Sequence, residues 1–464
     1  MQIYLIKNIR VVNEGSIRCA DVLIRNGRIE RIAPMIGSID ADHTEIDGEG
    51  KYLFPGVIDD QVHFREPGLT HKATIQTEAK AAVAGGVTSF MEMPNTVPPA
   101  FTEKLLEEKY DIARSSSLAN YSFYIGTSNE NAEDALKINK RKNDVCGIKI
   151  FMGSSTGNLL VDNPLTLEKV FSESELLIAT HCEDERVIRQ NLAAIKGTGR
   201  ELTAKDHPLI RNEEACFESS FYAVQLAKKY NSRLHILHIT TEKELQLFSN
   251  MLPLKEKRIT AEVCVHHLHF SSDDYDTLGN KIKCNPAIKA PHNRAALWEG
   301  LLDDRLDVIA TDHAPHTLAE KNETYEKAHA GLPLVQHSLS MMLYYHSIGR
   351  LSLAKIAEKM SHAVADCFQV KERGYIREGY HADLVIVDPA LRSVVAAENI
   401  LYKCGWSPLE AVPGRDAMQF PASITHTFVN GRLVFSCTST KGDQQVWNPA
   451  WNESNKGERL LFDR

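Results

Sequence analysis

The middle of the chain alternates short apolar runs with longer amphipathic stretches. Eight apolar runs have the length of buried strands, and helix-like segments such as Thr74–Ala84 and Glu213–Tyr230 separate them. Strands that alternate with helices are typical of an α/β fold with a parallel sheet. Eight such units over about 300 residues predict a closed (β/α)8 TIM-type barrel. The predicted strands are Val57–His63, Thr88–Pro94, Tyr121–Thr127, Gly147–Met152, Leu176–His181, Arg233–Thr240, Ile259–Leu268 and Asp307–Ala314.

The two ends of the chain have a different pattern, that of short strands joined by tight turns. Each end contains Asn-Gly between two β-like runs, around Asn26-Gly27 and Asn430-Gly431, which is the strongest short hairpin signal. Because chain termini often lie close together, we expect both ends to form one small composite β-sandwich domain. The expected bounds are 1–54 and 371–464 for the two parts of this domain and 55–370 for the barrel.

Composition narrows the class of protein. Of the 464 residues, 43% are hydrophobic and 25% are charged, which is typical of a globular protein. The formal net charge of −8 argues against a globally basic protein that binds nucleic acid. The nine cysteines contain no C-x-x-C pair, which favours reduced thiols in a cytoplasmic protein. No signal peptide and no long apolar run are recognisable, so we expect no membrane partner.

The 19 histidines are the unusual feature of the composition, and several stand where predicted strands end. In a (β/α)8 barrel the carboxyl ends of the strands meet at one rim, which carries the chemistry. Imidazole and carboxylate ligands together suit zinc and similar divalent ions. Five candidates from five different strands are therefore expected at this rim: His63, Lys149, His181, His238 and Asp312.

Lys149 is the most informative of these residues because it lies within an apolar run. An unpaired buried ammonium is costly, and desolvation lowers the pKa of a lysine. The neutral amine could add carbon dioxide and become a carbamate, which is a carboxylate on a long stem that can bridge two metal ions. A position at a sheet edge, or a side chain that reaches the surface, is the alternative.

Five sequence motifs stand at or near these positions: DQVHFREPG at 60–68, MPNT at 93–96, KIFM at 149–152, TDHAPH at 311–316 and CGWSP at 404–408. With these motifs the chain resembles the dihydroorotases of the amidohydrolase superfamily over nearly its whole length. The resemblance implies the barrel with its flanking β domain, a carbamate on Lys149, and the reversible closure of N-carbamoyl-L-aspartate to L-dihydroorotate in pyrimidine biosynthesis.

The sequence departs from the family pattern at Gln61, where the family usually has a histidine two residues before His63. Residues two apart on a strand share a face, so Gln61 should still point at the site. Its amide oxygen is a weaker zinc ligand than imidazole, and its amide nitrogen is no ligand. We expect one firmly held zinc ion at His181, His238 and carbamylated Lys149, and a weak or absent second ion.

Asp312 is expected to be the catalytic residue as well as a metal ligand. A bound metal lowers the pKa of water toward 7, and Asp312 can take the proton of that water and pass it to the leaving nitrogen.

Other residues are candidates for binding the substrate. Arg65 offers a planar fork for a carboxylate, and Asn95 can donate its amide to the same group. A surface salt bridge of Arg65 with Glu66, and a turn-shaping role for Asn95, are the alternatives. The candidate contacts are Arg65, Asn95, His316, Asn285, Gly331 and Leu332.

Two polar clusters are interpreted as structural. In the run from His266 to His269, strand alternation would put His266 opposite His267, and this stretch is no ligand motif in the resembling family. Asp59 and Asp60 also alternate in direction and are expected to orient the first strand, for instance by supporting His63.

The alternatives to a dihydroorotase are a hydantoinase or allantoinase, or a non-catalytic dihydroorotase-like scaffold. The expected partners are a small-molecule substrate, a second copy of the chain in a homodimer, and aspartate transcarbamoylase. Gln61 motivates the scaffold hypothesis, whereas the retained polar cluster at the rim argues for an enzyme.

Overall fold

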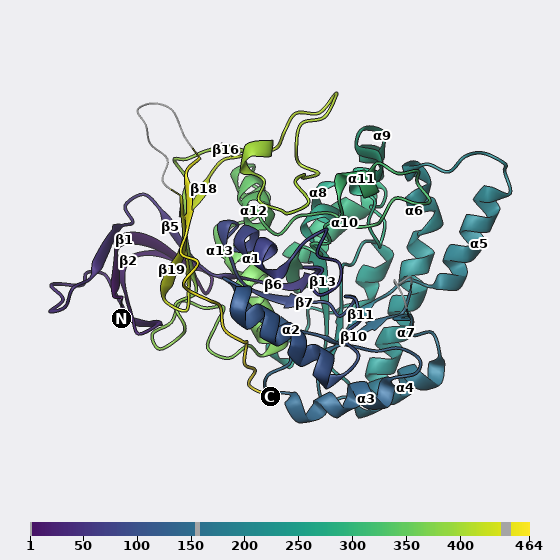
Figure 1. The fold of residues 1–464 in the computed structure, drawn as a ribbon, viewed down its shortest axis with the longest axis horizontal. Helices are drawn as coiled ribbons and strands as arrows, with labels where there is room; N and C mark the ends of the chain where they lie inside the picture. The colour runs from purple at the N-terminus through teal and green to yellow at the C-terminus, as the bar shows by residue number, and fades with distance from the viewer. Residues whose placement is uncertain (1, 154–157, 438–446) are drawn as a thin grey trace.

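Parallel strands form the barrel that the alternating pattern predicts (Figure 1). The computed structural model describes residues 2–153, 158–437 and 447–464. The strands are hydrogen-bonded in the orders β6-β7-β8 and β9-β10-β11-β12-β13-β14, and Val62 pairs in parallel with His313 between the two ends of the ring. All eight predicted strands are present, the third as two pieces. The bounds are β6 Val57–Val62, β7 Val87–Glu92, β8 Asn120–Phe123, β9 Ile125–Gly126, β10 Ile148–Phe151, β11 Ile178–His181, β12 Leu234–Ile236, β13 Ile259–Cys264 and β14 Val308–Ala310.

Helices surround the strands, and the two predicted helices are confirmed. α1 begins after Thr74, whose side chain accepts a hydrogen bond from the backbone of Thr77, and ends at Ala84, just before the capping residue Gly85. α7 has the predicted bounds. The helices are α1 Ile75–Ala84, α2 Glu103–Ser116, α3 Ala132–Leu136, α4 Pro164–Glu173, α5 Glu185–Lys196, α6 His207–Ile210, α7 Glu213–Tyr230, α8 Val265–His269, α9 Tyr275–Leu278, α10 Pro291–Leu302, α11 Leu318–Lys321, α12 Ser338–Ser347, α13 Leu353–Ala357 and α14 Ala363–Phe368.

The seventh strand is shorter than predicted. β13 ends at Cys264 and the chain continues as helix α8, so His266 and His267 lie on a helix with ring centroids 4.0 Å apart. The strand alternation expected for these two residues is therefore wrong. A short apolar run does not distinguish a strand from a buried helical turn, and no glycine or proline marks the change here.

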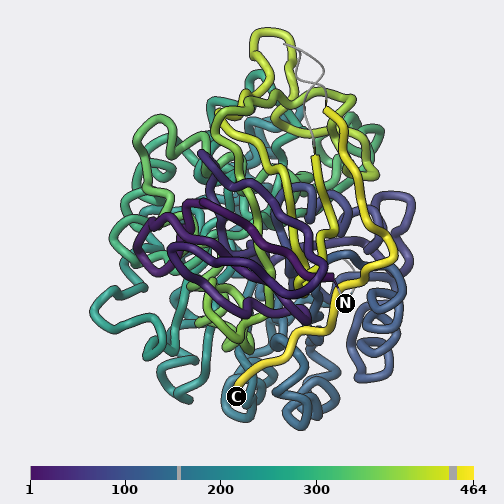
Figure 2. Tube along the Cα trace, turned by 90° about the vertical axis from the view of Figure 1, so that its left-hand side faces the viewer, coloured from purple at the N-terminus to yellow at the C-terminus, as the bar shows by residue number. Residues whose placement is uncertain are grey.

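The two ends of the chain form one composite β domain, as predicted (Figure 2). Both predicted hairpins are present, β2 with β3 and β18 with β19. β5 joins the halves by pairing with β1 and with β15, and the sheet order is β20-β19-β18-β15-β5-β1-β2-β3, with β4 beside β1. The domain bounds at 54 and 370 remain a prediction. The strands are β1 Tyr4–Asn13, β2 Ser16–Arg25, β3 Arg28–Ala33, β4 Thr44–Asp47, β5 Tyr52–Pro55, β15 Leu384–Asp388, β18 Ser423–Val429, β19 Arg432–Cys437 and β20 Pro449–Trp451, with β16 Ser393–Val394 and β17 Gln419–Phe420 in a separate pair.

Two further features concern the cysteines and the helices. All nine cysteines lie in the described part of the chain and are free thiols there. Among the described residues, no helix combines the length and apolar character needed to cross a membrane.

Candidate active site

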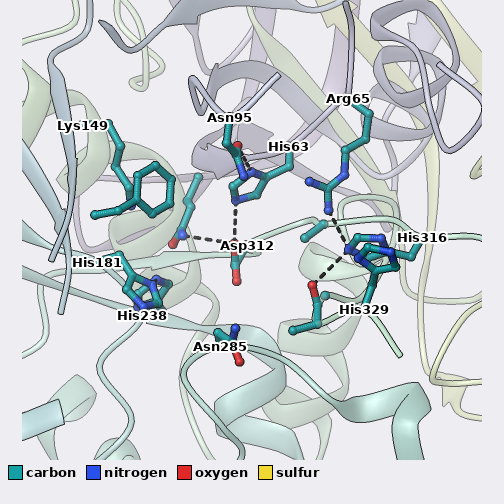
Figure 3. A pocket seen from close by; sticks show the side chains of 15 residues that line it. His63, Arg65, Asn95, Lys149, His181, His238, Asn285, Asp312, His316 and His329 are labelled. Atoms are coloured by element: carbon teal, nitrogen blue, oxygen red, sulfur yellow. Dashed lines mark hydrogen bonds and ion pairs between the residues drawn. The ribbon is translucent and has the colours of Figure 1, made fainter. Parts of the chain in front are cut away.

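A cavity of about 230 Å³ is lined by residues at the carboxyl ends of the barrel strands (Figure 3). Every predicted site residue except Leu332 lines it, whereas Leu332 packs in the hydrophobic core. Phe151, Ala314 and His329 also line the cavity and are not among the predicted residues. The predicted residues in the lining are Gln61, His63, Arg65, Asn95, Lys149, His181, His238, Asn285, Asp312, His316 and Gly331.

His181 and His238 converge at one side of this cavity. His181 is the last residue of β11 and His238 follows β12, and His181 Nδ1 lies 3.0 Å from His238 Nε2. Burial lowers the pKa of both imidazoles, so both are neutral near pH 7. Two neutral imidazoles whose ring nitrogens lie this close together are suited to hold a divalent metal ion.

Glu183 fixes the orientation of His181 and is a residue that sequence reasoning missed. The second ring nitrogen of His181 lies 2.9 Å from Glu183 Oε2, so a proton there leaves Nδ1 with its lone pair. Burial alone would raise the pKa of Glu183, but the charge of Arg211 and the hydrogen bond from His181 lower it to about 2. An ionised carboxylate behind a histidine is a common arrangement in metal sites. Glu183 stands two residues after His181 at the end of a predicted strand, and this spacing is the feature of the sequence that could have identified it.

Lys149 lies within β10 and is 1% exposed, so it is neither at the surface nor at an edge of the sheet. Its Nζ is 4.5 Å from the ring centroid of Phe151. Burial lowers the pKa of the amine to about 8, against the charges of Asp312 and Glu262, which raise it. A much larger share of Lys149 is therefore neutral at pH 7 to 8 than for an exposed lysine.

Asp312 is held by two neighbours on one carboxylate oxygen. Gln61 Nε2 donates to Asp312 Oδ1 over 3.1 Å, and His63 Nε2 is 3.1 Å from the same oxygen (Figure 3). His63 Nδ1 in turn lies 2.7 Å from Asn95 Oδ1. Burial alone would raise the pKa of Asp312, but the hydrogen bond and charge of His63 lower it below its ordinary value. Asp312 is thus ionised near neutral pH, as a general base must be.

Gln61 turns its amide nitrogen toward Asp312 and its amide oxygen toward Cys264, whose Sγ is 3.8 Å away. The side chain lines the cavity, as the strand register suggests. In this orientation it presents a hydrogen-bond donor to Asp312, and a donor amide is not a metal ligand.

Arg65 and His316 form the other side of the cavity (Figure 3). Arg65 is 6% exposed; its Nε donates to Pro315 O over 3.1 Å and its Nη2 is 3.1 Å from His316 Nε2. The alternative of a surface salt bridge with Glu66 is wrong, because Glu66 accepts instead from the backbone of Ile75. A buried guanidinium at a cavity wall is suited to an anionic ligand group.

His316 is supported from several directions. Trp406, in the late CGWSP motif, donates from its indole nitrogen to His316 O over 2.7 Å. His329 stacks on the imidazole with centroids 4.8 Å apart, and Lys72 Nζ lies 2.9 Å from His316 Nδ1. Gly331 passes so close that a Cβ there would clash with the backbone of Ala314. Lys72 and His329 reach the site from loops, so no local pattern in the sequence marks them.

The backbone is strained at three of the residues in the lining. Arg65, His238 and Asp312 have φ angles of 68°, 40° and 47°, a region that non-glycine residues rarely adopt. Such strain persists only where surrounding contacts enforce it, and it is concentrated at functional sites.

Asp59 and Asp60 do not support His63 as the sequence suggested. Asp59 accepts hydrogen bonds from the backbone and hydroxyl of Thr311, at 3.2 and 2.7 Å, and so ties the first barrel strand to the eighth. Asp60 is directed toward His235 on β12, with 3.2 Å between its Oδ2 and His235 Nε2.

Comparison with known proteins finds similar sequences over most of the chain. Residues 52–434 match the model of the amidohydrolase family. A dihydroorotase of Methanosarcina acetivorans is 33% identical over 445 residues, which cover 93% of this chain and 91% of that protein. A dihydroorotase of Pyrococcus abyssi is 30% identical and covers 96% of each chain.

Solved structures agree in fold. The L-hydantoinase (dihydropyrimidinase) of Arthrobacter aurescens superimposes with a TM-score of 0.85 at 25% identity, covering 97% of this chain and 98% of that one. A dihydropyrimidinase of Brevibacillus agri also gives 0.85, at 22% identity and with full coverage of both chains, and so supports the fold alone. The chain belongs to the amidohydrolase family.

Proposed function

We propose that this chain is a dihydroorotase, which interconverts N-carbamoyl-L-aspartate and L-dihydroorotate in pyrimidine biosynthesis. The observation that carries the proposal is one cavity with the converging pair His181 and His238, an ionised Asp312, and the buried Arg65 opposite them. A substrate that is a cyclic amide with a carboxylate needs metal ligands and a general base at the amide, and a cationic side chain at the carboxylate. The sequence relatives named dihydroorotase, at 30 and 33% identity over nearly the whole chain, support the assignment.

The residues fit a zinc ion at His181, His238 and a carbamate on Lys149. The amine of Lys149 would form one bond to the carbon of carbon dioxide and lose one proton to water, and burial favours this because it raises the neutral fraction. A zinc ion held there supplies Lewis acidity, which lowers the pKa of water and polarises a ring carbonyl. We expect one such ion, because Gln61 offers its donor side to Asp312.

Asp312 would carry the proton between water and the ring nitrogen. His63 and Gln61 occupy Oδ1, and we assign proton transfer to Oδ2. In hydrolysis, Asp312 takes a proton from the attacking water and delivers it to the leaving nitrogen, and in ring closure it takes one from the ureido nitrogen. Arg65 would bind the substrate carboxylate through its planar fork, and Asn95 would donate its amide to the same group.

Replacing Arg65 with methionine is expected to raise KM for dihydroorotate about 100-fold. Charge-assisted hydrogen bonds from a guanidinium to a carboxylate contribute about 3 kcal/mol, which corresponds to this factor. Steady-state kinetics in both directions measure it. Arg189→Met, at an exposed arginine, is the control and should leave KM unchanged. A KM within twofold of the wild-type value for Arg65→Met would remove Arg65 from the binding role.

Replacing Gln61 with histidine is expected to raise the number of zinc ions in the cavity from about one to about two per chain, because imidazole is the stronger ligand. Metal analysis of both proteins measures this, and anomalous scattering locates the ions. Gln61→Asn, which keeps an amide, is the matched control. Two fully occupied ions in the wild-type protein, with Gln61 bound to one, would contradict the expectation.

Hydantoinase or allantoinase activity is the alternative within the family, and the structural neighbours include proteins named hydantoinase and dihydropyrimidinase. Hydantoin and allantoin lack the ring carboxylate for which Arg65 is suited. An assay with dihydroorotate, hydantoin and allantoin separates these activities. A non-catalytic scaffold is supported only by Gln61, whereas the ionised Asp312 and the oriented His181 support catalysis. The homodimer, the association with aspartate transcarbamoylase and the cytoplasmic location remain predictions.

A further inference from the structure

A second group of ligand-type side chains lies inside the barrel and outside the cavity. Asp60 on β6, His235 on β12 and Glu262 on β13 are each 0% exposed, and none of them lines the cavity. Their donor atoms lie within 4.8 Å of one another. His235 Nε2 is 3.2 Å from Asp60 Oδ2 and 3.7 Å from Glu262 Oε2.

The inward-facing atoms of this group lack hydrogen bonds. Within residues 2–153, 158–437 and 447–464, no partner with hydrogen-bond geometry meets either oxygen of Asp60, His235 Nε2 or Glu262 Oε2. Buried polar atoms are almost always satisfied, so four such atoms in one place call for a ligand.

The outward-facing atoms, by contrast, are held. His235 Nδ1 lies 2.7 Å from the hydroxyl of Thr260, and Glu262 Oε1 accepts from the backbone nitrogen of His238 over 3.0 Å. One side of His235 and one side of Glu262 are thus fixed by a neighbour, while the other side of each is directed into the group, where both oxygens of Asp60 are open. This is the arrangement that orients metal ligands in proteins.

The charge of the group also favours a cation. Its two carboxylates have no lysine or arginine in ion-pair contact within the described part of the chain, and His235 is their ion-pair partner there. Ligands around a tetrahedral zinc ion, with bonds of about 2.0 Å, are about 3.3 Å apart. The two measured separations bracket this value.

We propose that Asp60, His235 and Glu262 bind a divalent metal ion, for which zinc is the probe, at a site separate from the candidate catalytic metal. Glu262 also accepts a hydrogen bond from the backbone nitrogen of His238. An ion bound to Glu262 would therefore help to fix the strained backbone of His238, whose side chain is a candidate ligand of the catalytic zinc ion. The proposal does not rest on the proposed activity.

The alternative to a metal ion is a proton on His235, which would supply the positive charge beside the two carboxylates. Burial lowers the pKa of His235, but Asp60 and Glu262 raise it to about 9. An imidazolium would balance one carboxylate, and the other is neutralised only if Glu262 also takes a proton; burial and the charge of Asp60 raise the pKa of Glu262 to about 7. The N–H of His235 meets neither carboxylate with hydrogen-bond geometry. A divalent ion beside a neutral imidazole balances both carboxylates.

Zinc content distinguishes the two occupants. The full chain with His181→Ala and His238→Ala lacks the candidate catalytic ligands, and we expect it to retain about one zinc ion per chain after dialysis. Adding Asp60→Asn should reduce this to below about 0.1 ion. Glu244→Gln is the matched control and should keep the ion, because Glu244 is equally buried but bonds to Ser220 and Thr241. No zinc in the His181→Ala, His238→Ala protein, or zinc that survives Asp60→Asn, would overturn the proposal.

Anomalous scattering at the zinc edge tests the same site without any variant, should the combined variants fail to fold. Crystals of the wild-type protein should give a peak between Asp60, His235 and Glu262. Peaks confined to the cavity with His181 and His238 would overturn the site and leave the proposed activity untouched.

Discussion

Asp312→Asn is expected to lower kcat by about 10³-fold in both directions while fold and zinc content stay close to those of the wild-type protein. General acid–base catalysis contributes about 10² to 10⁴-fold, and an amide cannot carry the proton. Asparagine has nearly the same shape and can keep the hydrogen bond from Gln61 to the side-chain oxygen. The expected zinc ion is held by His181, His238 and Lys149, so its ligands remain.

Turnover of dihydroorotate, zinc analysis and thermal unfolding together measure this result. Asp111→Asn, at an exposed aspartate, is the control and should behave as the wild-type protein. Activity of Asp312→Asn within tenfold of the wild-type value would exclude Asp312 as the proton carrier. Loss of zinc with intact fold would instead make Asp312 a ligand of the retained ion.

Lys149→Met is expected to abolish both turnover and firm zinc binding in the cavity. Methionine fits the apolar interior of β10 but cannot form a carbamate, so the ion loses the one anionic group among its three expected ligands. We expect kcat to fall by more than about 10³-fold, since the Lewis acid and its polarised water are lost together. Zinc content should fall in parallel.

Chemical rescue makes the test of Lys149 specific. Formate or acetate can enter the space left by the carbamate and should restore part of the activity of Lys149→Met when zinc is supplied. Lys142→Met, at an exposed lysine, is the control. Full zinc content and activity in Lys149→Met would rule out a carbamate ligand.

The predictable part of the site follows from the topology of the fold. Once eight strands alternate with helices, their carboxyl ends must meet, so residues as distant as His63 and Asp312 can be placed together without any knowledge of side-chain packing. The composite β domain was predictable for a similar reason, because each end carries its own hairpin signal.

The other features of the fold and the site depend on contacts between residues far apart in the chain, or on packing, which local sequence patterns do not reveal. The sequence places Gln61 on the correct face, but only packing turns its amide nitrogen toward Asp312 and its oxygen toward Cys264. The change from β13 to α8 has no glycine or proline to mark it. Asp60 and His235 come from strands far apart in the chain, so their proximity depends on side-chain directions in the barrel interior.

The central claim, that this chain is a metal-dependent dihydroorotase, is tested most directly by turnover of the purified full chain. L-dihydroorotate and N-carbamoyl-L-aspartate are each supplied to zinc-loaded protein, to chelated protein and to chelated protein reloaded with zinc. The account predicts interconversion of the two compounds that is lost on chelation and restored by zinc. Folded, zinc-loaded protein that converts neither compound would contradict it.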